Sequence, residues 1–448
     1  MRVTGKPFGS ICLIGLGLFI LYWVTAPMAT ELHAVFDGQS SAAQGTEFSG
    51  VPAEVPVLDA LGITSAESTL IAGLAGFPYQ AEAYTPGYYS LRAYDDSLLY
   101  VGDSLWKARK PPIWSNEMYY DRAMIDYLYW WRTGDTLRLG RADEYLVSYR
   151  DEYVLPNTTT EWACPTGKWH FPEGLAVHWL LRGDSLSRNA VSHMARCHGG
   201  PGKSWMTRAA DTSFIYIDGR AQGRALLDVT LAAHLELPGR TFTGEPANYD
   251  WDSLAAAGAD SLIALYSRSQ AGIGPTTGRW HLSSYCYGQA NFQVAHALLY
   301  GFARYSDLRG DGSRADTIES IVTTSLDTIL AYRRSFEGQP VIQYSSLRPD
   351  WPNGVDTTCA AHYQGMQFNG DGVPDDTTAF GGKDLNGLFV GVLGWAFDKT
   401  GDSTYWYMAD SLTGAMLNVT SWYGNSGKAY NQSFWQSQRA LYWLNGGP

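Results

Sequence analysis

A short turn of nearly constant sequence recurs four times and divides most of the chain into pairs of helices. It reads Thr-Gly-Asp or Arg-Gly-Asp at residues 133–135, 182–184, 309–311 and 400–402. Glycine adopts the left-handed conformation that ends one helix, and aspartate accepts hydrogen bonds from the free N–H groups that begin the next. Because apolar residues recur at helical spacing after each turn, the pattern predicts helical hairpins. The turn explains all four sites, which argues against an adhesion role for the Arg-Gly-Asp tripeptides.

The hairpins are separated by long and uneven loops. The pattern predicts helical pairs at about residues 117–150, 172–197, 219–268, 288–334 and 384–418. A last helix near 430–445 needs a partner, which a helix around 65–76 can supply. Open solenoids keep short, regular connections, whereas long loops on a helical frame are typical of a ring with a binding site. The fold class expected is therefore all-α dominated, an α/α toroid of about six helical hairpins with short β-hairpins in the long loops.

The N-terminal segment has the pattern of an export signal. Arg2 and Lys6 precede an apolar run at 11–24, and small residues follow it. This favours a cleaved signal over residues 1–29, with an uncleaved membrane anchor as the alternative, because the run is short for a membrane span. Residues 30–56 are predicted to be a polar linker and residues 57–448 a single domain. We therefore expect a secreted, periplasmic or cell-surface protein that contacts a membrane only through this segment.

Charge and aromatic content narrow the range of partners. The net charge is −12 without a basic stripe, which argues against nucleic acid. Aromatic residues make up 14% of the chain, and their large rings suit stacking on sugars. No phosphate-binding glycine loop or dinucleotide motif is present, so no nucleotide or organic cofactor is expected.

The cysteines are consistent with export. Four remain after the predicted signal, an even number that allows two disulfide bonds. The pairing we favour is Cys164 with Cys197 and Cys286 with Cys359, because each bond would then join a hairpin to its own loop. Four buried free thiols are the alternative.

The C-terminal third of the chain carries the motifs that point to a known superfamily. They are GKDLNGL at 382–388, GWAFDKTGDSTYWYMAD at 394–410 and SGKAYNQSFWQSQRALYWL at 426–444. With the hairpins and turns of residues 85–448, these motifs resemble the six-hairpin glycosidase-like superfamily, which includes glycosidases, sugar epimerases and toroidal polysaccharide lyases. The resemblance implies a carbohydrate partner and a site at the mouth of the toroid, where the inner helices begin.

Two carboxyl groups at predicted helix starts fit glycoside hydrolysis. Such an enzyme needs one protonated and one ionised carboxyl group. Glu173 follows a proline at a helix start beside aromatic residues and is the expected acid, with Asp384 as base or nucleophile. Glu117 and Asp121 are held in reserve. The residues expected to bind the sugar are Trp169, His170, Arg279, Tyr287, Gln289, Asn291, Asn386 and Trp435.

A lyase would use a different set of groups. Removing a proton beside a uronate carboxylate needs a tyrosine or histidine base and a group that neutralises the developing charge. One segment supplies both kinds of group: Arg279, His281, Tyr285, Tyr287, Gln289 and Asn291. An acidic protein is a poor match for a polyanionic substrate, so hydrolysis is favoured.

Two further alternatives concern a metal and the absence of catalysis. An aspartate-rich segment resembles one unit of the calcium repeats of secreted proteins and offers oxygen ligands at Asn369, Asp371, Asp375 and Asp376. A solvated turn explains the same residues. The protein can also be a non-catalytic, surface or structural glycan-binding protein that keeps the toroid and its aromatic side chains.

Overall fold

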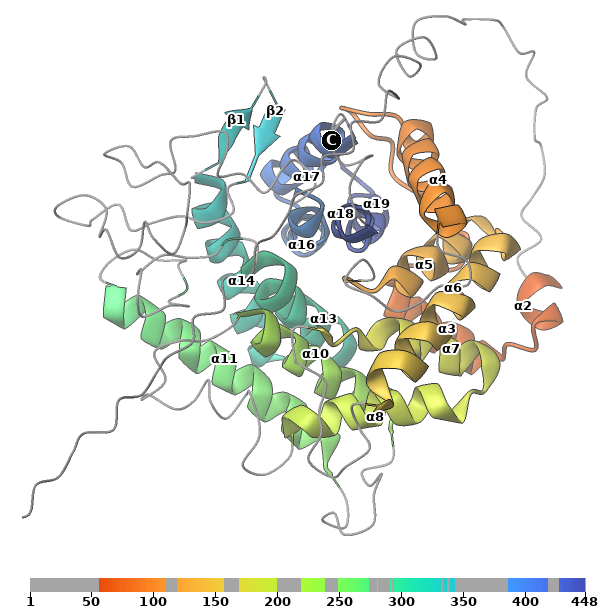
Figure 1. Cartoon of the computed structure of the whole chain (residues 1–448). Coiled ribbons are helices and arrows are strands. Elements are labelled where there is room, and N and C mark those ends of the chain that lie inside the picture. The colour runs from red at the N-terminus through yellow and green to blue at the C-terminus, as the bar shows by residue number, and fades with distance from the viewer. Residues whose placement is uncertain are drawn as a thin grey trace, which may run out of the picture. The chain divides into compact units, whose positions relative to one another are not determined.

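The computed structural model describes most of the C-terminal nine-tenths of the chain, and the described residues are mostly helical (Figure 1). These are residues 56–108, 119–156, 169–199, 219–237, 249–273, 280, 291, 294–310, 312–331, 333–336, 339–342, 386–417 and 427–447. Residues Glu54–Pro448 form one compact unit, distinct from Met1–Ala53.

Five helical pairs lie where the sequence pattern predicts them, and four of these pairs are joined by the recurring turns. The two helices of each pair contact one another. The pairs are α5 (Arg122–Thr133) with α6 (Thr136–Tyr149), α7 (Pro172–Arg182) with α8 (Ser185–Gly199), α10 (Gly219–His234) with α11 (Trp251–Ile273), α13 (Tyr300–Arg309) with α14 (Ser313–Ala331), and α16 (Gly387–Thr400) with α17 (Ser403–Leu417). Two π-helical segments, η2 (Arg150–Val154) and η5 (Val294–Leu299), continue α6 and precede α13.

The turns have the predicted chemistry. The four glycines of the turns have positive φ, as at Gly134 (77°) and Gly401 (68°). Asp135 accepts a hydrogen bond from the Leu137 N–H at 2.9 Å, and Asp402 accepts one from the Thr404 N–H at 2.8 Å. Asp311 lies outside the described residues. The turn geometry is encoded locally, because glycine and aspartate act on their own backbone.

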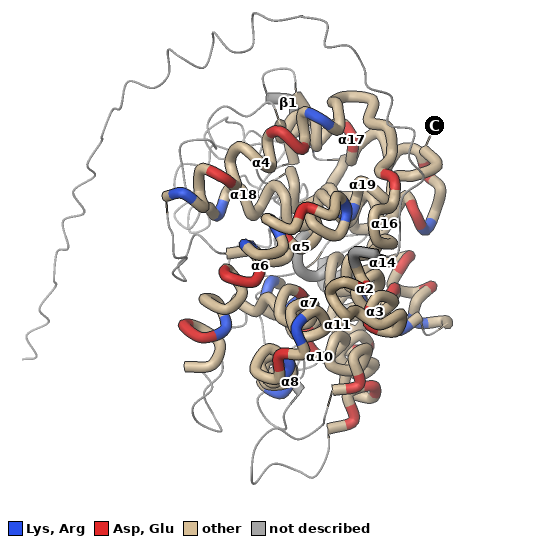
Figure 2. Tube along the Cα trace, turned by 90° about the vertical axis from the view of Figure 1, so that its right-hand side faces the viewer, with Lys and Arg blue, Asp and Glu red and all other residues tan. Residues whose placement is uncertain are grey.

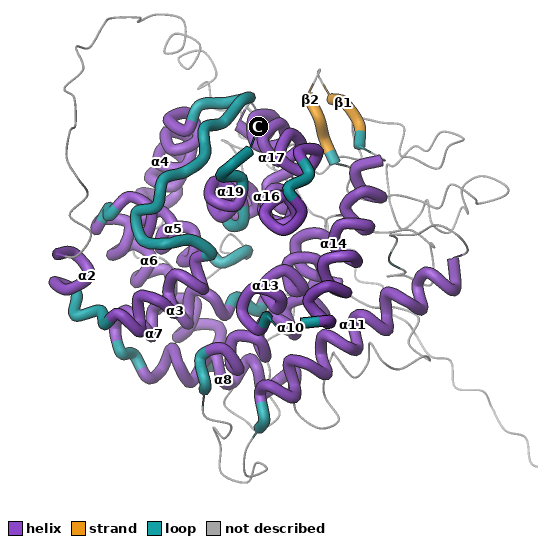
Figure 3. Tube along the Cα trace, turned by 180° about the vertical axis from the view of Figure 1, so that it is seen from behind, coloured by secondary structure: helices purple, strands orange, loops and turns teal. Residues whose placement is uncertain are grey.

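The remaining elements complete the described structure (Figure 3). They are α2 (Pro56–Ala60), α3 (Ser65–Ala75), α4 (Leu91–Ala108), α18 (Gly427–Phe434), α19 (Ser437–Trp443) and an antiparallel pair of strands, β1 (Arg334–Phe336) and β2 (Gln339–Val341). The sequence analysis pairs the last helix with residues 65–76, and Arg439 of α19 donates a hydrogen bond to the Leu74 carbonyl oxygen of α3. Helix α3 also packs against α7. Helix α4, which is missing from the sequence prediction, packs against α17 and α18.

The first helices of the pairs pack against one another. Helix α7 contacts α5 and α10, α10 contacts α13, and α13 contacts α16. Helix α16 contacts α18 and α19, and both of these contact α5. All residues of α10 from Ala221 to Ala233 are buried, whereas one face of α14 is exposed to solvent. Acidic and basic positions are interspersed along the helices in Figure 2.

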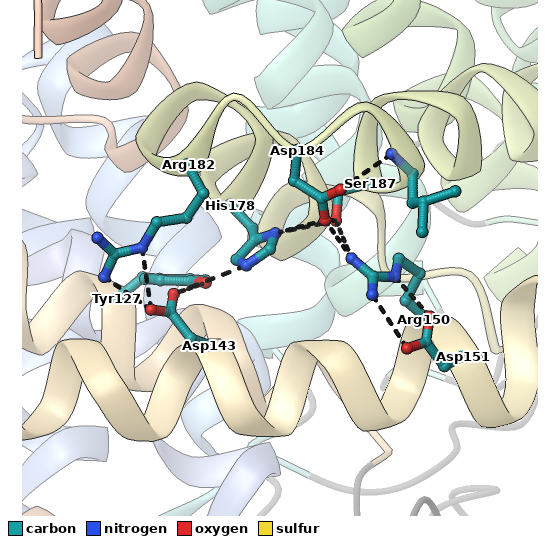
Figure 4. A network of polar contacts seen from close by, with 9 residues as sticks. Tyr127, Asp143, Arg150, Asp151, His178, Arg182, Asp184 and Ser187 are labelled. Atoms are coloured by element: carbon teal, nitrogen blue, oxygen red, sulfur yellow. Dashed lines mark hydrogen bonds and ion pairs between the residues drawn. The ribbon is translucent and has the colours of Figure 1, made fainter.

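A polar network joins the first two pairs (Figure 4). Asp184, the capping residue of the second turn, contacts Arg150 of η2 and lies 3.3 Å from Nδ1 of His178. On the other side of His178, Asp143 of α6 accepts hydrogen bonds from Arg182 at 2.7 and 3.0 Å. Burial lowers the pKa of His178, and the two aspartates only partly offset this. The turn residue therefore both begins α8 and fixes the two pairs together.

Candidate functional site

The starts of α5 and α7 meet α13 and α19 around one buried carboxylate. Glu173 is the second residue of α7 and is fully buried. The hydroxyl of Tyr300 lies 2.9 Å from both carboxylate oxygens, Nε of Arg304 lies 3.3 Å from Oε1, and a terminal nitrogen of Arg439 lies 3.0 Å from Oε1. Two guanidinium groups and one hydroxyl group therefore contact this carboxyl group. The sequence-based role of Glu173 as the acid stays a prediction.

The two arginines also hold the end of α3. A terminal nitrogen of Arg304 donates to the carbonyl oxygens of Gly73 and Leu74, and Arg439 donates to Leu74 as well. Glu173 therefore sits where four helices from distant parts of the chain converge. Asp121, Glu173, Tyr300, Arg304 and Arg439 are called the carboxylate cluster below.

Asp121 provides a second carboxyl group beside the first. It caps α5 in a left-handed conformation (φ 42°) and is 5% exposed. Its side chain accepts hydrogen bonds from the N–H groups of Met124 at 3.1 Å and Gly174 at 3.0 Å. Burial raises the pKa of Asp121 to about 7; the charge of Glu173 adds to this rise, and the two N–H groups and Arg439 oppose it. Near neutral pH Asp121 therefore exchanges a proton while its neighbour is held by cations.

A buried histidine–aspartate pair lies at the same helix start. Nδ1 of His170 is 2.6 Å from Oδ2 of Asp228 on α10, and both side chains are inaccessible to solvent. The sequence analysis assigns His170 to sugar binding. The contact with Asp228 shows what orients its imidazole ring.

Aromatic rings surround these groups. The aromatic cluster consists of Tyr119, Tyr120, Trp169, Phe171 and Trp435. The ring of Tyr119 lies 4.5 Å from that of Trp169 and 5.6 Å from that of Phe171. Trp435 lies 5.9 Å from Tyr120 and 6.4 Å from Phe171. Trp169 and Trp435, both predicted to contact sugar, thus belong to one cluster; Trp169 is half-buried and Trp435 is buried.

Other predicted residues have different positions. Asn386 precedes α16 and is buried, and its amide group bonds the backbone of Pro340 (3.1 Å) and Ile342 (3.3 Å) beside β2. This holds the strand in place, so the described contacts of Asn386 are structural. Asn291 is buried. Cys197 is buried near the end of α8, and the disulfide pairing stays a prediction.

Many predicted residues lie outside the described part of the chain. They include the candidate catalytic and sugar-binding residues Glu117, Arg279, His281, Tyr285, Tyr287, Gln289 and Asp384. The proposed calcium ligands Asn369, Asp371, Asp375 and Asp376 and the cysteines Cys164, Cys286 and Cys359 lie there too. Calcium binding therefore stays a prediction.

Sequence reasoning missed the cations of the site. Arg439 directly precedes the apolar segment ALYWL, and Arg304 lies in the largely apolar segment LLYGFARY. An arginine in an otherwise apolar helix is a signal that could have found them, because charged residues are seldom fully buried unless they have a partner. Which partner each arginine takes depends on the tertiary packing.

Within the described ranges, no group of three or more His, Cys, Asp or Glu side chains is placed to hold a metal ion. In that same part of the chain, none of the helices has the length and apolar character needed to cross a membrane. No protein-family profile, curated protein or solved structure matches the chain.

Proposed function

We propose that the protein is an exported glycoside hydrolase, built on an α/α toroid, that acts on an oligo- or polysaccharide. The observation that carries this proposal is the pairing of Asp121 with Glu173, two buried carboxyl groups in different electrostatic surroundings. Hydrolysis of a glycosidic bond uses one protonated and one ionised carboxyl group.

Helix contacts support the toroid. The contacts of the first helices run from α5 through α7, α10, α13 and α16 to α19, and α19 contacts α5 again. A sequence of neighbours that returns to its first member is what a closed arrangement requires, whereas an open solenoid leaves its two end repeats apart. The export signal predicted at residues 1–29 is the reason for placing the enzyme outside the cytoplasm.

The roles follow from the surroundings of each carboxyl group. Asp121, with a pKa raised to about 7, is the group suited to donate a proton. Glu173, in contact with Arg304 and Arg439, is the group proposed to act in its ionised form. Asp384 lies outside the described residues, and its role as base or nucleophile stays a prediction from the sequence. The aromatic cluster supplies ring faces for sugar.

The test is a screen of the full chain against a polysaccharide panel, reading both reducing ends and unsaturated products. Release of reducing ends is expected, and D121N should lower turnover by about two to four orders of magnitude. The matched control is D135N, which alters a capping aspartate of α6 remote from the aromatic cluster and should keep full turnover. Full turnover in D121N would contradict the assignment, and unsaturated products would establish a lyase instead.

Non-catalytic glycan binding is the second candidate. It is favoured by the complete burial of Glu173 and by the number of donors that satisfy it, since these are also features of a structural ion cluster. Under this alternative the protein binds glycans with no turnover, and D121N leaves that binding unchanged. Measuring glycan affinity alongside turnover separates the two candidates.

A further inference from the structure

Three buried hydrogen-bond donors beside the carboxylate cluster have no acceptor within the described residues. Arg224 on α10 is 2% exposed, and none of its three guanidinium nitrogens makes a hydrogen bond. The hydroxyl of Tyr119 and the indole nitrogen of Trp435 are unsatisfied as well. Buried polar groups in proteins are nearly always paired, and an unpaired buried cation is especially unfavourable. An acceptor that joins the protein from solution would account for all three.

The three donors share the same aromatic neighbours. The Arg224 guanidinium lies 4.6 Å from the ring centre of Phe171, 5.1 Å from that of Tyr119 and 5.7 Å from that of Tyr120. Trp435, which comes from the C-terminal part of the chain, also packs near Tyr120 and Phe171. The unsatisfied donors are therefore grouped around Tyr120 and Phe171.

The charges nearby favour an anion. Asp228, one helical turn after Arg224, pairs with His170, and no ion pair joins it to Arg224 in the described structure. The ammonium group of Lys428 also lies near the ring of Tyr119, 5.7 Å from its centre, and Lys428 is exposed. The exposed Lys428 and the half-buried Trp169 therefore place one edge of the aromatic cluster at the protein surface. Asp121 is the acidic side chain next to Tyr120 in sequence, and its own charge is reduced by its raised pKa.

We propose that Arg224, with the Tyr119 hydroxyl and the Trp435 indole N–H, binds the carboxylate of an acidic sugar unit. The saccharide part of this inference rests on the proposed function. A guanidinium group matches a planar carboxylate with two parallel hydrogen bonds, and the aromatic rings stack on the sugar. One buried cation in an acidic protein suits a glycan with isolated uronic acid units, because a continuous polyanion would be repelled by the net charge of −12.

The experiment compares matched ligands by calorimetry on the full chain. The probes are a trisaccharide with one glucuronate, the trisaccharide with glucose in its place, the methyl ester of the glucuronate form, and a form bearing a 6-sulfate. The glucuronate form should bind, and the glucose and methyl ester forms should bind about 10- to 100-fold more weakly. R224M should reduce glucuronate binding by the same factor and leave glucose binding unchanged.

A stability measurement separates a ligand-binding cation from a structural one. R224M removes an unpaired buried charge, so without ligand it should unfold at the same temperature as the parent or higher. The matched control is R138M, since Arg138 is equally buried but pairs with Asp126 at 3.1 Å and with Asp103, and it should unfold at a lower temperature. A loss of stability in R224M with no change in glucuronate affinity would overturn the inference.

The remaining outcomes are also decisive. Equal affinity for the glucose and glucuronate forms overturns the subsite, and tighter binding of the sulfate form overturns the choice of carboxylate. D121N should lose turnover and keep glucuronate binding. Turnover that depends on Asp121 but is indifferent to Arg224 and to the acidic unit would overturn the subsite and leave the proposed hydrolase standing.

Discussion

Buried arginines of this protein differ in what their guanidinium groups contact. Arg138 pairs with two aspartates, Arg304 and Arg439 share Glu173, and Arg224 lies against aromatic rings. The sequence predicts Glu173 as a residue of interest from its helix start, but its cations come from helices more than 100 residues away. Local patterns hold no information on such partners, which is why the predicted role and the observed contacts of Glu173 differ.

Glu173→Gln should lower the free energy of unfolding by about 3–5 kcal/mol. The change keeps the shape of the side chain but removes the ion-pair partner of Arg439 and leaves Arg304 only its longer contact with Asp307, at 3.9 Å. Urea unfolding measures the effect. The control is Glu67→Gln, because Glu67 lies in the capping box of α3, where glutamine also serves, and its loss should be small. Equal stability of the two variants would show that Glu173 is not the counter-charge of these arginines.

Asp121 should make stability depend on pH in a defined window. Its pKa is about 7 in the folded protein against an ordinary value of 3.8, so between these values the folded state binds the proton more tightly. The free energy of unfolding should therefore fall as pH rises from about 4 to about 7, by at most about 1.4 kcal/mol per pH unit from this group. D121N should lack this contribution in urea unfolding across a pH series. Parallel curves for D121N and the parent would contradict the prediction.

At the scale of the helix, close packing depends on glycines at the points where two helices cross. A methyl group on Gly301 of α13 would lie 2.6 Å from the carbonyl oxygen of Gly223 on α10, next to Arg224. On α16, a methyl group on Gly387 would lie 2.5 Å from the carbonyl oxygen of Ser433, and one on Gly394 would lie 3.0 Å from Cα of Ala440. The recurring turns could be predicted because glycine and aspartate act within a few residues. These crossings could not, since a helical glycine looks the same in sequence whether or not a neighbour lies against it.

Gly301→Ala should destabilise the protein by about 1–3 kcal/mol, because backbone atoms of α10 must move to admit the methyl group. Gly140→Ala is the control: Gly140 is an exposed position in α6 with open space around it, and alanine there should be neutral or stabilising by up to about 1 kcal/mol. Thermal unfolding of the two variants measures the difference. A neutral Gly301→Ala would mean that α10 and α13 are not in contact at this point.

At the scale of the whole molecule, the C-terminal helices bind the first pair. Asn431 of α18 donates to the Tyr119 carbonyl oxygen at 2.7 Å and accepts a hydrogen bond from Arg122, and Gln438 of α19 donates to the Ile125 carbonyl oxygen at 2.8 Å. The all-helical class and the helical pairs could be predicted from periodicity and turns. The toroid is expected from the number of hairpins and their long loops, and it stays a proposal because the contacts that support closure connect segments far apart in the sequence.

Unfolding should occur in one cooperative transition over α3 to α19. In the proposed toroid the set of neighbouring helices has no free end from which pairs can unfold one after another, unlike an open array. Far-ultraviolet circular dichroism and tryptophan fluorescence should give coincident urea curves. Asn431→Ala should shift both curves to lower urea together. Separate transitions for the two probes would indicate pairs that unfold independently.

The hydrogen bonds between distant segments set an expectation for folding speed. Helical proteins usually fold fast because most of their contacts are local in sequence, that is, their contact order is low. Here the Tyr84 hydroxyl bonds Asp410 across 326 residues, Asn431 bonds Tyr119 across 312, and Arg439 bonds Glu173 across 266. Each helical pair can form early, but joining segments this far apart carries a loop-closure entropy that local hairpins avoid. The rate-limiting step of folding should therefore be the meeting of the two ends of the helical array, with refolding slower than helix content alone suggests.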